Sequence, residues 1–270
     1  MAAAFRASSL VGETLGERRI VQLLASGGIG HVYVAIDHEQ QHHRALKVLR
    51  PELAGRTSHR ERFEREAEAA SATQHPHVVR VDGPVREDGG LWFFTMELLR
   101  GLDVADTLAQ HGPLSALRAA RIVRGAARGL AALHSAGVIH RDVKPENLFL
   151  VHAADGREVV KVIDFGSAWL ATTRTGAATS SQRPLGTPEY APPEGLALTI
   201  GRGAGDIYSL GLVFHEMLGG HLPFGAGERA SVGQDPALDA LLAAMLDPAP
   251  EARPTAGEVD TTLGALFELP

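Results

Sequence analysis

One polar run, HRDVKPEN from His140 to Asn147, constrains the fold of this chain more than any other feature. It follows Leu117 to Ser135, where apolar side chains recur at the spacing of an amphipathic helix. Two short apolar runs come next, Leu148 to Val151 and Val159 to Ile163, joined by an Asp-Gly turn signal that predicts a hairpin. Asp164-Phe165-Gly166 stands where the second run ends. This order predicts that carboxylates, an amide and a cation lie in one region.

The residue types in this region suit phosphoryl transfer. That reaction needs a carboxylate that orients the hydroxyl, ligands for a metal ion and cations beside the phosphates. Asp142 can accept the hydroxyl proton, and Lys144 can neutralise the transferring group. Asn147 and Asp164 offer hard oxygen ligands of the kind that Mg²⁺ prefers. We therefore expect ATP and Mg²⁺ as cofactors, with Mn²⁺ as an alternative metal.

A glycine-rich segment lies between two predicted strands, Ile20 to Leu24 and His31 to Ile36. The residues expected to approach a nucleotide are Ala25, Ser26, Gly27, Gly28 and Gly30. Glycine there lets backbone amides reach phosphate oxygens without an intervening side chain. Glycine-rich turns between strands are also common in purely structural roles, so this segment alone leaves both interpretations open.

A single lysine, Lys47, lies in the next predicted strand, Arg44 to Leu49. A buried ammonium group is costly without a counter-charge, and Glu66 in the following predicted helix, His59 to Ala70, is the best-placed partner. That helix is expected to pack one face on the sheet through Phe63, Ala67 and Ala70. Lone lysines in strands usually extend to solvent instead. The prediction of a Lys47–Glu66 ion pair therefore depends on the motifs that begin at His140.

The remaining pattern predicts an α+β fold in two lobes. Further strands are expected over Val78 to Val81 and Leu91 to Met96, on either side of an Asp-Gly-Gly turn. Ser167 to Arg183 has no period and is typical of a functional or mobile loop. The boundary between the strand-rich and helical parts is near Leu98 to Gly101. Helices are expected over three later segments, Asp206 to Leu218, Ala237 to Leu246 and Thr255 to Phe267.

The composition excludes several classes of protein. No cysteine is present among the 270 residues, which removes disulfides, thiolate zinc sites and a cysteine nucleophile. The net charge of −6 argues against a nucleic-acid partner, whose binding normally requires a basic excess. No apolar stretch approaches the roughly 20 residues of a membrane helix, and the N-terminus lacks a secretory signal. We expect a cytoplasmic protein with no membrane segment in this chain.

Several motifs stand in a characteristic order along the chain. They are the glycine-rich segment, Lys47, HRDVKPEN, DFG, GTPEYAPPE over 186–194, DIYSLG over 206–211 and a late Arg253-Pro254. In this order the chain resembles the eukaryotic-like serine/threonine protein kinases, especially their bacterial branch, from about Leu10 to Phe267. The resemblance implies a bilobal protein kinase fold, with a small N-terminal β-sheet lobe plus one helix and a larger, mainly helical C-terminal lobe. It also implies an N-terminal extension over 1–17, an N-lobe over 18–97, a hinge over 98–101 and a C-lobe over 102–270, in a single kinase domain over 18–267.

The resemblance assigns nucleotide-binding roles to individual residues. Met96 is expected to be the gatekeeper, and Glu97 to Leu99 to offer hinge backbone to the adenine. Val32 and Ala45 would cover the adenine, and Phe149 would lie beneath it. These side chains would serve equally well in ordinary core packing, and the two roles do not exclude each other.

The resemblance assigns structural roles as well. Glu194 and Arg253 are expected to form the buried ion pair that anchors the activation segment in this family. Asp206 is expected to hold the backbone of the catalytic loop from the start of its helix, where a carboxylate also suits the helix dipole. The implied structure of the activation segment therefore depends on three charged side chains.

The implied reaction is transfer of the γ-phosphoryl group of ATP to serine or threonine hydroxyls of a protein substrate. Lys144, two residues after Asp142, is the serine/threonine form of this loop. Thr187 matches the threonine that pairs with that aspartate and lysine in the family. Arg141 implies control by activation-loop (auto)phosphorylation, because a phosphate there can satisfy the arginine. Counting back from Thr187 predicts Thr179 and Ser181 as phosphosites, with Thr172, Thr173 and Thr175 as alternatives.

The chain departs from the family pattern at three places. Ala25 replaces the first loop glycine, which costs little if its φ is negative and about 1 kcal/mol otherwise. Ala-Pro-Glu becomes Pro192-Pro193-Glu194, which keeps the glutamate. Gly225 to Pro236 is short and glycine-rich where the family carries a docking helix. We expect this helix to be truncated or missing, which leaves room for a different use of the site, such as a regulatory protein partner.

Two other functions compete with the interpretation as an active protein kinase. A pseudokinase that binds nucleotide and regulates a partner protein would be consistent with Ala25 and the shortened docking segment. A small-molecule phosphotransferase would share the metal-binding residues but not the GTPEYAPPE run. Bacterial relatives often continue into a membrane helix and a sensor domain, which this chain does not contain. We expect either a stand-alone soluble enzyme or one whose sensing is done by a separate protein.

Overall fold

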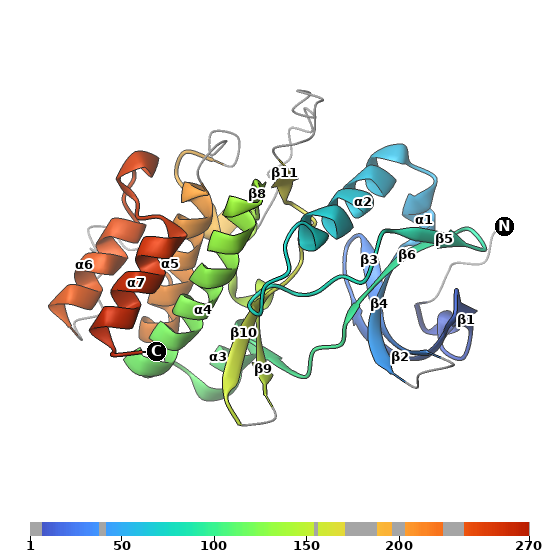
Figure 1. Ribbon diagram of the computed structural model, residues 1–270, viewed down its shortest axis with the longest axis horizontal. Helices are drawn as coiled ribbons and strands as arrows, with labels where there is room; N and C mark the ends of the chain where they lie inside the picture. The colour runs from blue at the N-terminus through green and yellow to red at the C-terminus, as the bar shows by residue number, and fades with distance from the viewer. Residues whose placement is uncertain are drawn as a thin grey trace. The chain divides into compact units, whose positions relative to one another are not determined.

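The computed structural model describes residues 7–37, 42–153, 156–170, 188–195, 203–223 and 235–269 (Figure 1). The chain divides into two compact units. The first contains residues 1–74 and 79–99, and the second contains residues 75–78 and 100–270. Among the described residues, no helix combines the length and the hydropathy that a membrane span requires.

The first unit is built on one six-stranded antiparallel sheet. The strands predicted over Ile20 to Leu24, His31 to Ile36, Arg44 to Leu49 and Leu91 to Met96 are confirmed, each within a residue or a few of its expected ends. In spatial order the strands are β1 (Thr14–Leu15), β2 (Arg18–Ser26), β3 (Gly30–Asp37), β4 (His43–Leu49), β6 (Leu91–Glu97) and β5 (Arg86–Asp88). The antiparallel register places Val32 opposite Lys47, and Ala45 opposite Met96.

One face of this sheet packs against helix α2 (Thr57–Ser71), which begins two residues before the predicted start. Phe63 and Ala67 of the helix are buried against Leu49 and Phe94 of the sheet, and the Phe63 and Phe94 rings lie 5.0 Å apart between centroids. The predicted apolar face of this helix is therefore confirmed. Side chains alternate along a strand, so Lys47 lies on the same face of β4 as Leu49.

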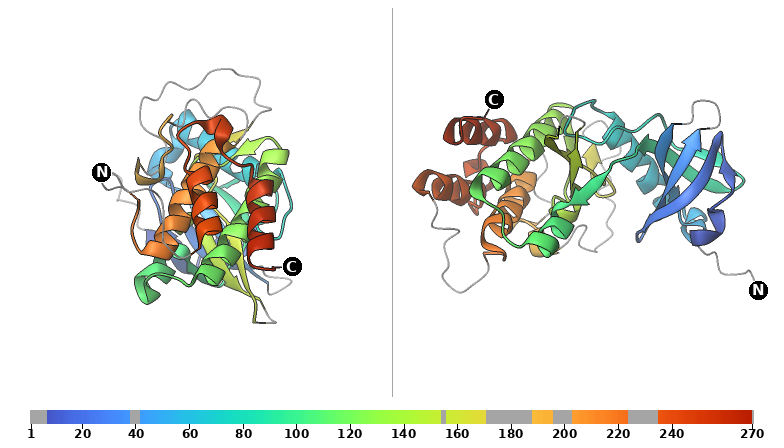
Figure 2. Two further views of the ribbon diagram at one scale, coloured as in Figure 1. Left: turned by 90° about the vertical axis from the view of Figure 1, so that its left-hand side faces the viewer. Right: turned by 90° about the horizontal axis from the view of Figure 1, so that it is seen from below.

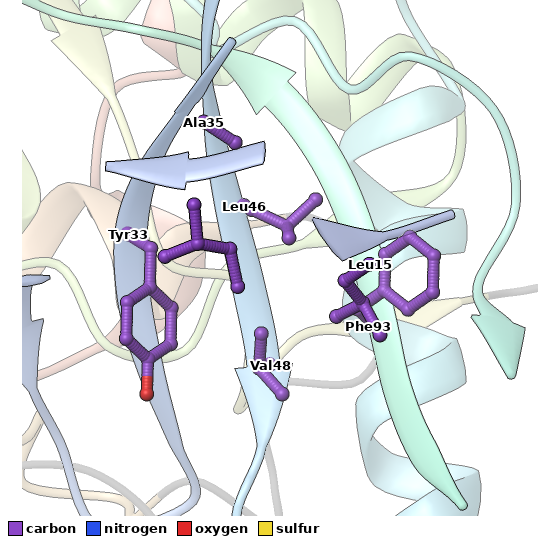
Figure 3. Packing of buried hydrophobic residues seen from close by; sticks show 7 residues of the cluster. Leu15, Tyr33, Ala35, Leu46, Val48 and Phe93 are labelled. Carbon is purple, nitrogen blue, oxygen red and sulfur yellow. The ribbon is translucent and has the colours of Figure 1, made fainter. Parts of the chain in front are cut away.

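The other face of the sheet carries a second apolar cluster (Figure 3), formed by Leu15, Ile20, Tyr33, Ala35, Leu46, Val48 and Phe93. The segment before β2 completes this cluster: Leu15 is buried within it, and Leu10, from the 3₁₀ helix η1 (Ala7–Leu10), packs against it. The hydroxyl of Tyr33 donates a hydrogen bond to the carbonyl of Ala7 over 2.8 Å. Residues 7–15 are therefore part of the folded first unit.

The second unit is mainly helical (Figures 1 and 2). Helix α4 packs against α5 and α7, and α6 packs against α5 and α7. The three late helices predicted from the sequence are confirmed, and so is the buried stripe of Ile122, Ala126, Leu130 and Leu133 on α4. The helices are α3 (Val104–His111), α4 (Ala116–Ser135), α5 (Ala204–Gly219), α6 (Pro236–Met245) and α7 (Ala256–Leu266).

Short strands surround the loop that follows α4. The predicted hairpin is formed by β9 (Leu148–His152) and β10 (Glu158–Val162), and β7 (Gly101–Asp103) pairs with the other edge of β9. A separate two-stranded pairing joins β8 (Val138–Ile139) to β11 (Trp169–Leu170). Short 3₁₀ helices complete the described elements, η2 (Pro145–Asn147), η3 (Pro188–Tyr190) and η4 (Pro250–Ala252).

The structure differs from the sequence expectations in several local elements. Val78 to Val81 does not form a strand. Val78 forms one isolated bridge with Val162, and Val81 forms one with Met96. The partner of β6 across the turn is β5, which is exposed and lacks an apolar pattern. Of the loop expected over Ser167 to Arg183, the described part holds a short strand, β11, and residues 171–183 lie outside the described residues. The helices α1 (Pro51–Ala54) and α3 were not predicted, although Asp103 caps α3 by accepting from the Asp106 amide.

Candidate active site

The glycine-rich segment is a tight turn between β2 and β3. The Gly27 amide donates to the Gly30 carbonyl over 2.8 Å. A Cβ on Gly30 would lie 2.6 Å from the Val48 carbonyl oxygen, so close approach of two strands requires glycine there. A Cβ on Gly28 would meet nothing within 4 Å, and its φ is not positive. The packing of the chain therefore does not explain why position 28 is glycine.

Ala25 fits its position without strain. In the described part of the chain, the non-glycine residues with positive φ are Arg141, Asp164 and Glu268, so Ala25 has a conformation open to any residue. It is exposed, lies opposite Val32 and follows a shift in the β2–β3 register. Replacement of the family's first glycine by alanine therefore carries no cost from backbone conformation.

Lys47 and Glu66 form an ion pair inside the first unit. Their side chains are 14% and 5% exposed, so Lys47 does not extend into solvent. The pair is formed because β4 points Lys47 toward α2 while the buried face of α2 carries Glu66 beside Phe63 and Ala67. A charge pair removed from water in this way requires good geometry to be tolerated.

The residues expected near an adenine lie on or directly after three strands of the first unit, β3, β4 and β6, and on one strand of the second. In the first unit, Ala45 is buried, Val32 and Met96 are half-buried, and Ala45 lies opposite Met96. The Glu97 amide donates to the Arg80 carbonyl over 2.9 Å, and Leu99 follows as a half-buried residue. In the second unit, Phe149 lies in β9, half-buried.

Leu24 was missed by the sequence reasoning. It precedes Ala25 and is 46% exposed, the most exposed of the large apolar side chains among the described residues. Leu23 packs against the cluster of Figure 3. Leu24 lies at the shift in register between Leu23, which pairs with Tyr33, and Ala25, which pairs with Val32. The signal for it was a bulky apolar residue at the edge of the glycine-rich segment.

Asp142 lies in a dense set of polar contacts in the second unit. Lys144 Nζ lies 3.3 Å from Asp142 Oδ2. The buried Asn147 donates through Nδ2 to the Asp142 carbonyl over 2.7 Å and to Asp142 Oδ2 over 3.3 Å. The side-chain amide nitrogen of Asn147 is thereby committed to Asp142, which orients the amide oxygen away from it.

The hairpin brings Asp164 to the same place. Leu148 pairs with Val162, and the Ile163 amide donates to the Asn147 carbonyl over 3.0 Å, so the hairpin's open end holds Asn147 beside the residue before Asp164. Asp164 is exposed, has φ +60° and accepts from the Gly166 amide through Oδ1 over 3.2 Å. Positive φ in a non-glycine residue concentrates at functional sites.

His140 links the loop to the hairpin exit. Its Nε2 donates to the Ile163 carbonyl over 3.0 Å, and its Nδ1 accepts from the Asp142 amide over 3.3 Å. The ring also contacts Phe165 at 5.1 Å between centroids. No residue pattern in the sequence had indicated this role.

Asp206 holds the backbone of the loop from the first turn of α5. The buried carboxylate accepts from the His140 amide over 2.9 Å and from the Arg141 amide over 2.8 Å. His134, also missed in the sequence reasoning, donates to it through Nε2 over 2.8 Å. Burial alone would raise the pKa of Asp206, but the bond and charge of His134, with His140 and the Arg141 amide, outweigh it, and the pKa is lowered.

Arg141 adopts a strained conformation beside this carboxylate, with φ +66°. Its guanidinium carbon lies 5.8 Å from the centre of the Trp169 ring, and its buried Nε has no hydrogen-bond partner in the part of the chain that the structure describes. Burial lowers the pKa of Arg141, although Asp206 opposes this. The Arg141 guanidinium therefore has an Nε–H donor that no described residue accepts.

Glu194 and Arg253 form a bidentate ion pair, with both N–O distances 2.7 Å. The Arg253 side chain is 0% exposed and also donates to the carbonyls of Asp247, Pro248 and Ala204. Its guanidinium carbon lies 4.8 Å from the centre of the Tyr208 ring. The residues after η3 are thereby fixed to the helical core.

A second set of hydrogen bonds holds the segment around η3 to helix α5. The Tyr190 hydroxyl donates to Glu216 Oε2 over 2.6 Å, and Ser209 Oγ donates to the Tyr190 carbonyl over 2.7 Å. Burial raises the pKa of Tyr190, as does the bond to Glu216. The expected residues Thr187, Thr179 and Ser181, and residues 224–234 of the shortened docking segment, lie outside the described residues.

Comparison with known proteins decides the family. The protein kinase domain family matches residues 18–262. The chain belongs to this family. The predicted family and the predicted protein kinase fold are thus confirmed, and the kinase domain of PknI from Mycobacterium tuberculosis supports the fold. That solved structure superposes with a TM-score of 0.72 at 27% identity, over 94% of this chain and 98% of the other.

Its curated relatives carry the names of bacterial serine/threonine kinases. This chain is 35% identical over 263 residues to probable serine/threonine-protein kinase pknA2 of Bifidobacterium longum. It is 39% identical over 221 residues to serine/threonine-protein kinase PknJ of Mycobacterium tuberculosis. These matches cover 90% and 82% of this chain, but only 34% and 37% of the two relatives. The chain thus spans about a third of the length of these relatives.

Proposed function

We propose that this kinase domain transfers the γ-phosphoryl group of ATP to serine or threonine hydroxyls of a protein. The observation that carries the proposal is the set of contacts around Asp142, whose carboxylate lies 3.3 Å from the Lys144 ammonium and 3.3 Å from the Asn147 amide. A carboxylate held beside a cation and an amide meets the needs of a reaction in which protein groups position and neutralise more than they bond.

The proposal gives distinct roles to four residues, which are Asp142, Lys144, Lys47 and Thr187. Asp142 orients the acceptor hydroxyl and accepts its proton, and Lys144 neutralises charge on the transferring group. Lys47, held by Glu66, pairs with the nucleotide phosphates. Thr187 pairs with Asp142 and Lys144 and helps to select serine and threonine, as the resemblance implies.

The donor set fits a divalent metal with a preference for oxygen. Asn147 commits its nitrogen to Asp142, which leaves the amide oxygen for a cation, and the exposed carboxylate of Asp164 supplies a charged oxygen. Mg²⁺ suits these ligands, and Mn²⁺ is an alternative. When bound, the ion supplies charge neutralisation of the phosphate oxygens.

The nucleotide base and phosphates have their own residues in the proposal. The first-unit set is Leu24, Ala25, Val32, Ala45, Met96, Glu97 and Leu99 for the base, with Ser26, Gly27, Gly28 and Gly30 near the phosphates. Phe149 of the second unit is assigned to the base by the family resemblance. Support comes from the open space at Gly28 and from the exposure of Leu24.

Regulation by phosphorylation is part of the proposal. Arg141 has a buried Nε with no partner among the described residues, and a phosphate is a strong acceptor for a guanidinium. Thr179 and Ser181 remain the proposed phosphosites, and Glu194, Arg253 and Asp206 the structural supports of the segment. A phosphate at either site would offer charge-assisted hydrogen bonds to the Arg141 guanidinium.

The pseudokinase alternative has no support in the comparisons, whose relatives carry kinase names. Lys47, Glu66, Asp142, Asn147 and Asp164 are all present, and Ala25 carries no backbone strain. A regulatory protein partner stays a proposal, as does a cytoplasmic location, which the need for ATP favours.

The test is a transfer assay with labelled ATP, Mg²⁺ and a generic basic protein substrate. Wild type is expected to label the substrate, and Asp142→Asn to lose about 10²- to 10⁴-fold in rate, because a positioned base is removed. Asp106→Asn, which neutralises an exposed carboxylate of α3, is the matched control and should keep the wild-type rate. Equal labelling by wild type and Asp142→Asn would contradict the proposed kinase activity.

A further inference from the structure

Arg50, the residue directly after β4, contacts the glycine-rich segment through both its backbone and its side chain. Its amide donates to the Ile29 carbonyl over 2.9 Å, and its Nε donates to the Gly27 carbonyl over 2.9 Å. These two carbonyls flank Gly28. One residue thus holds the main chain on both sides of the position that packing leaves open.

The bond to Gly27 fixes the orientation of the next amide. A trans peptide is planar, and its C=O and N–H groups point in opposite directions. A guanidinium that holds the Gly27 carbonyl therefore directs the Gly28 N–H away from Arg50. A charged donor on the carbonyl also polarises the peptide and strengthens the N–H as a donor.

Other bonds make this arrangement rigid. The Gly27 amide is held by the Gly30 carbonyl over 2.8 Å, and Ser26 Oγ is hydrogen-bonded to Nδ1 of the buried His31 over 3.1 Å. The turn thus has its donors and acceptors engaged on the Arg50 side, while a Cβ on Gly28 would meet nothing within 4 Å.

We propose that Arg50 is a positioning residue that presets the Gly28 amide for the phosphates of a nucleotide. The inference rests on the proposed function, in which the glycine-rich segment binds phosphate oxygens. Arg50 acts through the backbone of the segment and contributes to phosphate affinity. It has no part in binding the base.

Two probes, a nucleotide and a nucleoside, separate this role from general stability. Mg²⁺–ADP has phosphates and adenosine has none, so loss of a preset phosphate-binding amide weakens only the first. In calorimetric titrations, Arg50→Met is expected to raise the Kd for Mg²⁺–ADP about tenfold, which is the upper end for one hydrogen bond. The Kd for adenosine is expected to stay within about twofold.

A matched control removes the charge partner of Arg50 and leaves its bond to Gly27. Glu52 is exposed and pairs with Nη1 of Arg50, so Glu52→Gln should bind both probes as wild type does. If Arg50→Met does not fold, Arg50→Lys, which lacks the Nε donor, takes its place under the same comparison of ADP with adenosine.

The outcomes separate the inference from the function beneath it. Wild-type affinity of the Arg50 variant for Mg²⁺–ADP, or an equal loss for ADP and adenosine, would overturn the positioning role and leave the kinase proposal standing. A Glu52→Gln loss as large as that of Arg50→Met would also overturn it, because the Arg50 bond to the Gly27 carbonyl is kept in that variant. A wild-type protein that binds neither probe would overturn both proposals.

Discussion

The carboxylate of Asp206 accepts a hydrogen bond from the backbone amide of Arg141 over 2.8 Å. This contact holds Arg141 at φ +66°, in a region that costs a non-glycine residue about 1–3 kcal/mol. The residue that follows is Asp142. A buried side chain on α5 therefore determines the backbone from which the proposed base projects.

Replacement of Asp206 by asparagine should test this support. The amide keeps one acceptor, but loses the charge and leaves a donor opposite two backbone N–H groups. We expect a loss of about 2–4 kcal/mol in the free energy of unfolding, together with a lower transfer rate. Urea denaturation and the transfer assay measure the two effects, and an unchanged rate would show that Asp206 does not position Asp142.

The same carboxylate predicts a pH dependence. The pKa of Asp206 is lowered in the folded protein, so its stabilisation is present above the unfolded pKa of about 3.9 and is lost as pH falls toward the folded value. The difference in unfolding free energy between wild type and Asp206→Asn should be constant above about pH 5 and shrink below about pH 4. A difference that grows as pH falls would contradict the sign.

Two glycines of one turn should separate folding from nucleotide binding. Gly30→Ala places a Cβ 2.6 Å from the Val48 carbonyl oxygen, and we expect a loss of about 1–3 kcal/mol in stability. Gly28→Ala meets nothing within 4 Å, so its stability without nucleotide should change by no more than about 0.5 kcal/mol, while its affinity for Mg²⁺–ATP falls. Thermal denaturation of both variants, with and without nucleotide, would expose a reversed order.

The buried ion pair should show strong non-additivity. Arg253→Met leaves the Glu194 carboxylate without its partner, and we expect a loss of about 3–5 kcal/mol. In Arg253→Met with Glu194→Leu both charges are gone, so the loss should be smaller than in the single variant. Urea denaturation of the single variants and the double variant measures the coupling, and additive losses would mean that the pair contributes little.

The N-terminal segment should prove part of the folded unit, although the family match begins at residue 18. Leu15 is buried in the cluster of Figure 3, so Leu15→Ala should cost about 2–5 kcal/mol. Val11 is exposed, and Val11→Ala should change stability by no more than about 0.5 kcal/mol. Similar losses in both variants, measured by urea denaturation, would contradict a role for this segment in the core.

Local patterns in the sequence predicted most of the fold. The helical spacing of Phe63, Ala67 and Ala70 placed Glu66 on the sheet side of α2, where it meets Lys47. The apolar run at Val78 to Val81 misled because strand formation depends on partners distant in sequence. Here each end of the run finds a different partner, Val162 or Met96, by one bridge only.

The candidate site was predictable where a residue acts through its chemistry and not where it acts through geometry. Asp142, Asn147 and Asp164 were evident as carboxylates and an amide with known uses. His134 and Arg50 were not, because each acts by reaching one carboxylate or carbonyl that the fold brings near. Their residue types have many other uses, and only the distances distinguish them.

The most direct test of the central claim is the identity of the phosphorylated amino acid in a protein substrate after incubation with Mg²⁺ and ATP. We predict phosphoserine and phosphothreonine, formed by wild type and reduced about 10²- to 10⁴-fold in the Asp142→Asn variant. Phosphotyrosine alone, or the same small yield from both proteins, would contradict it.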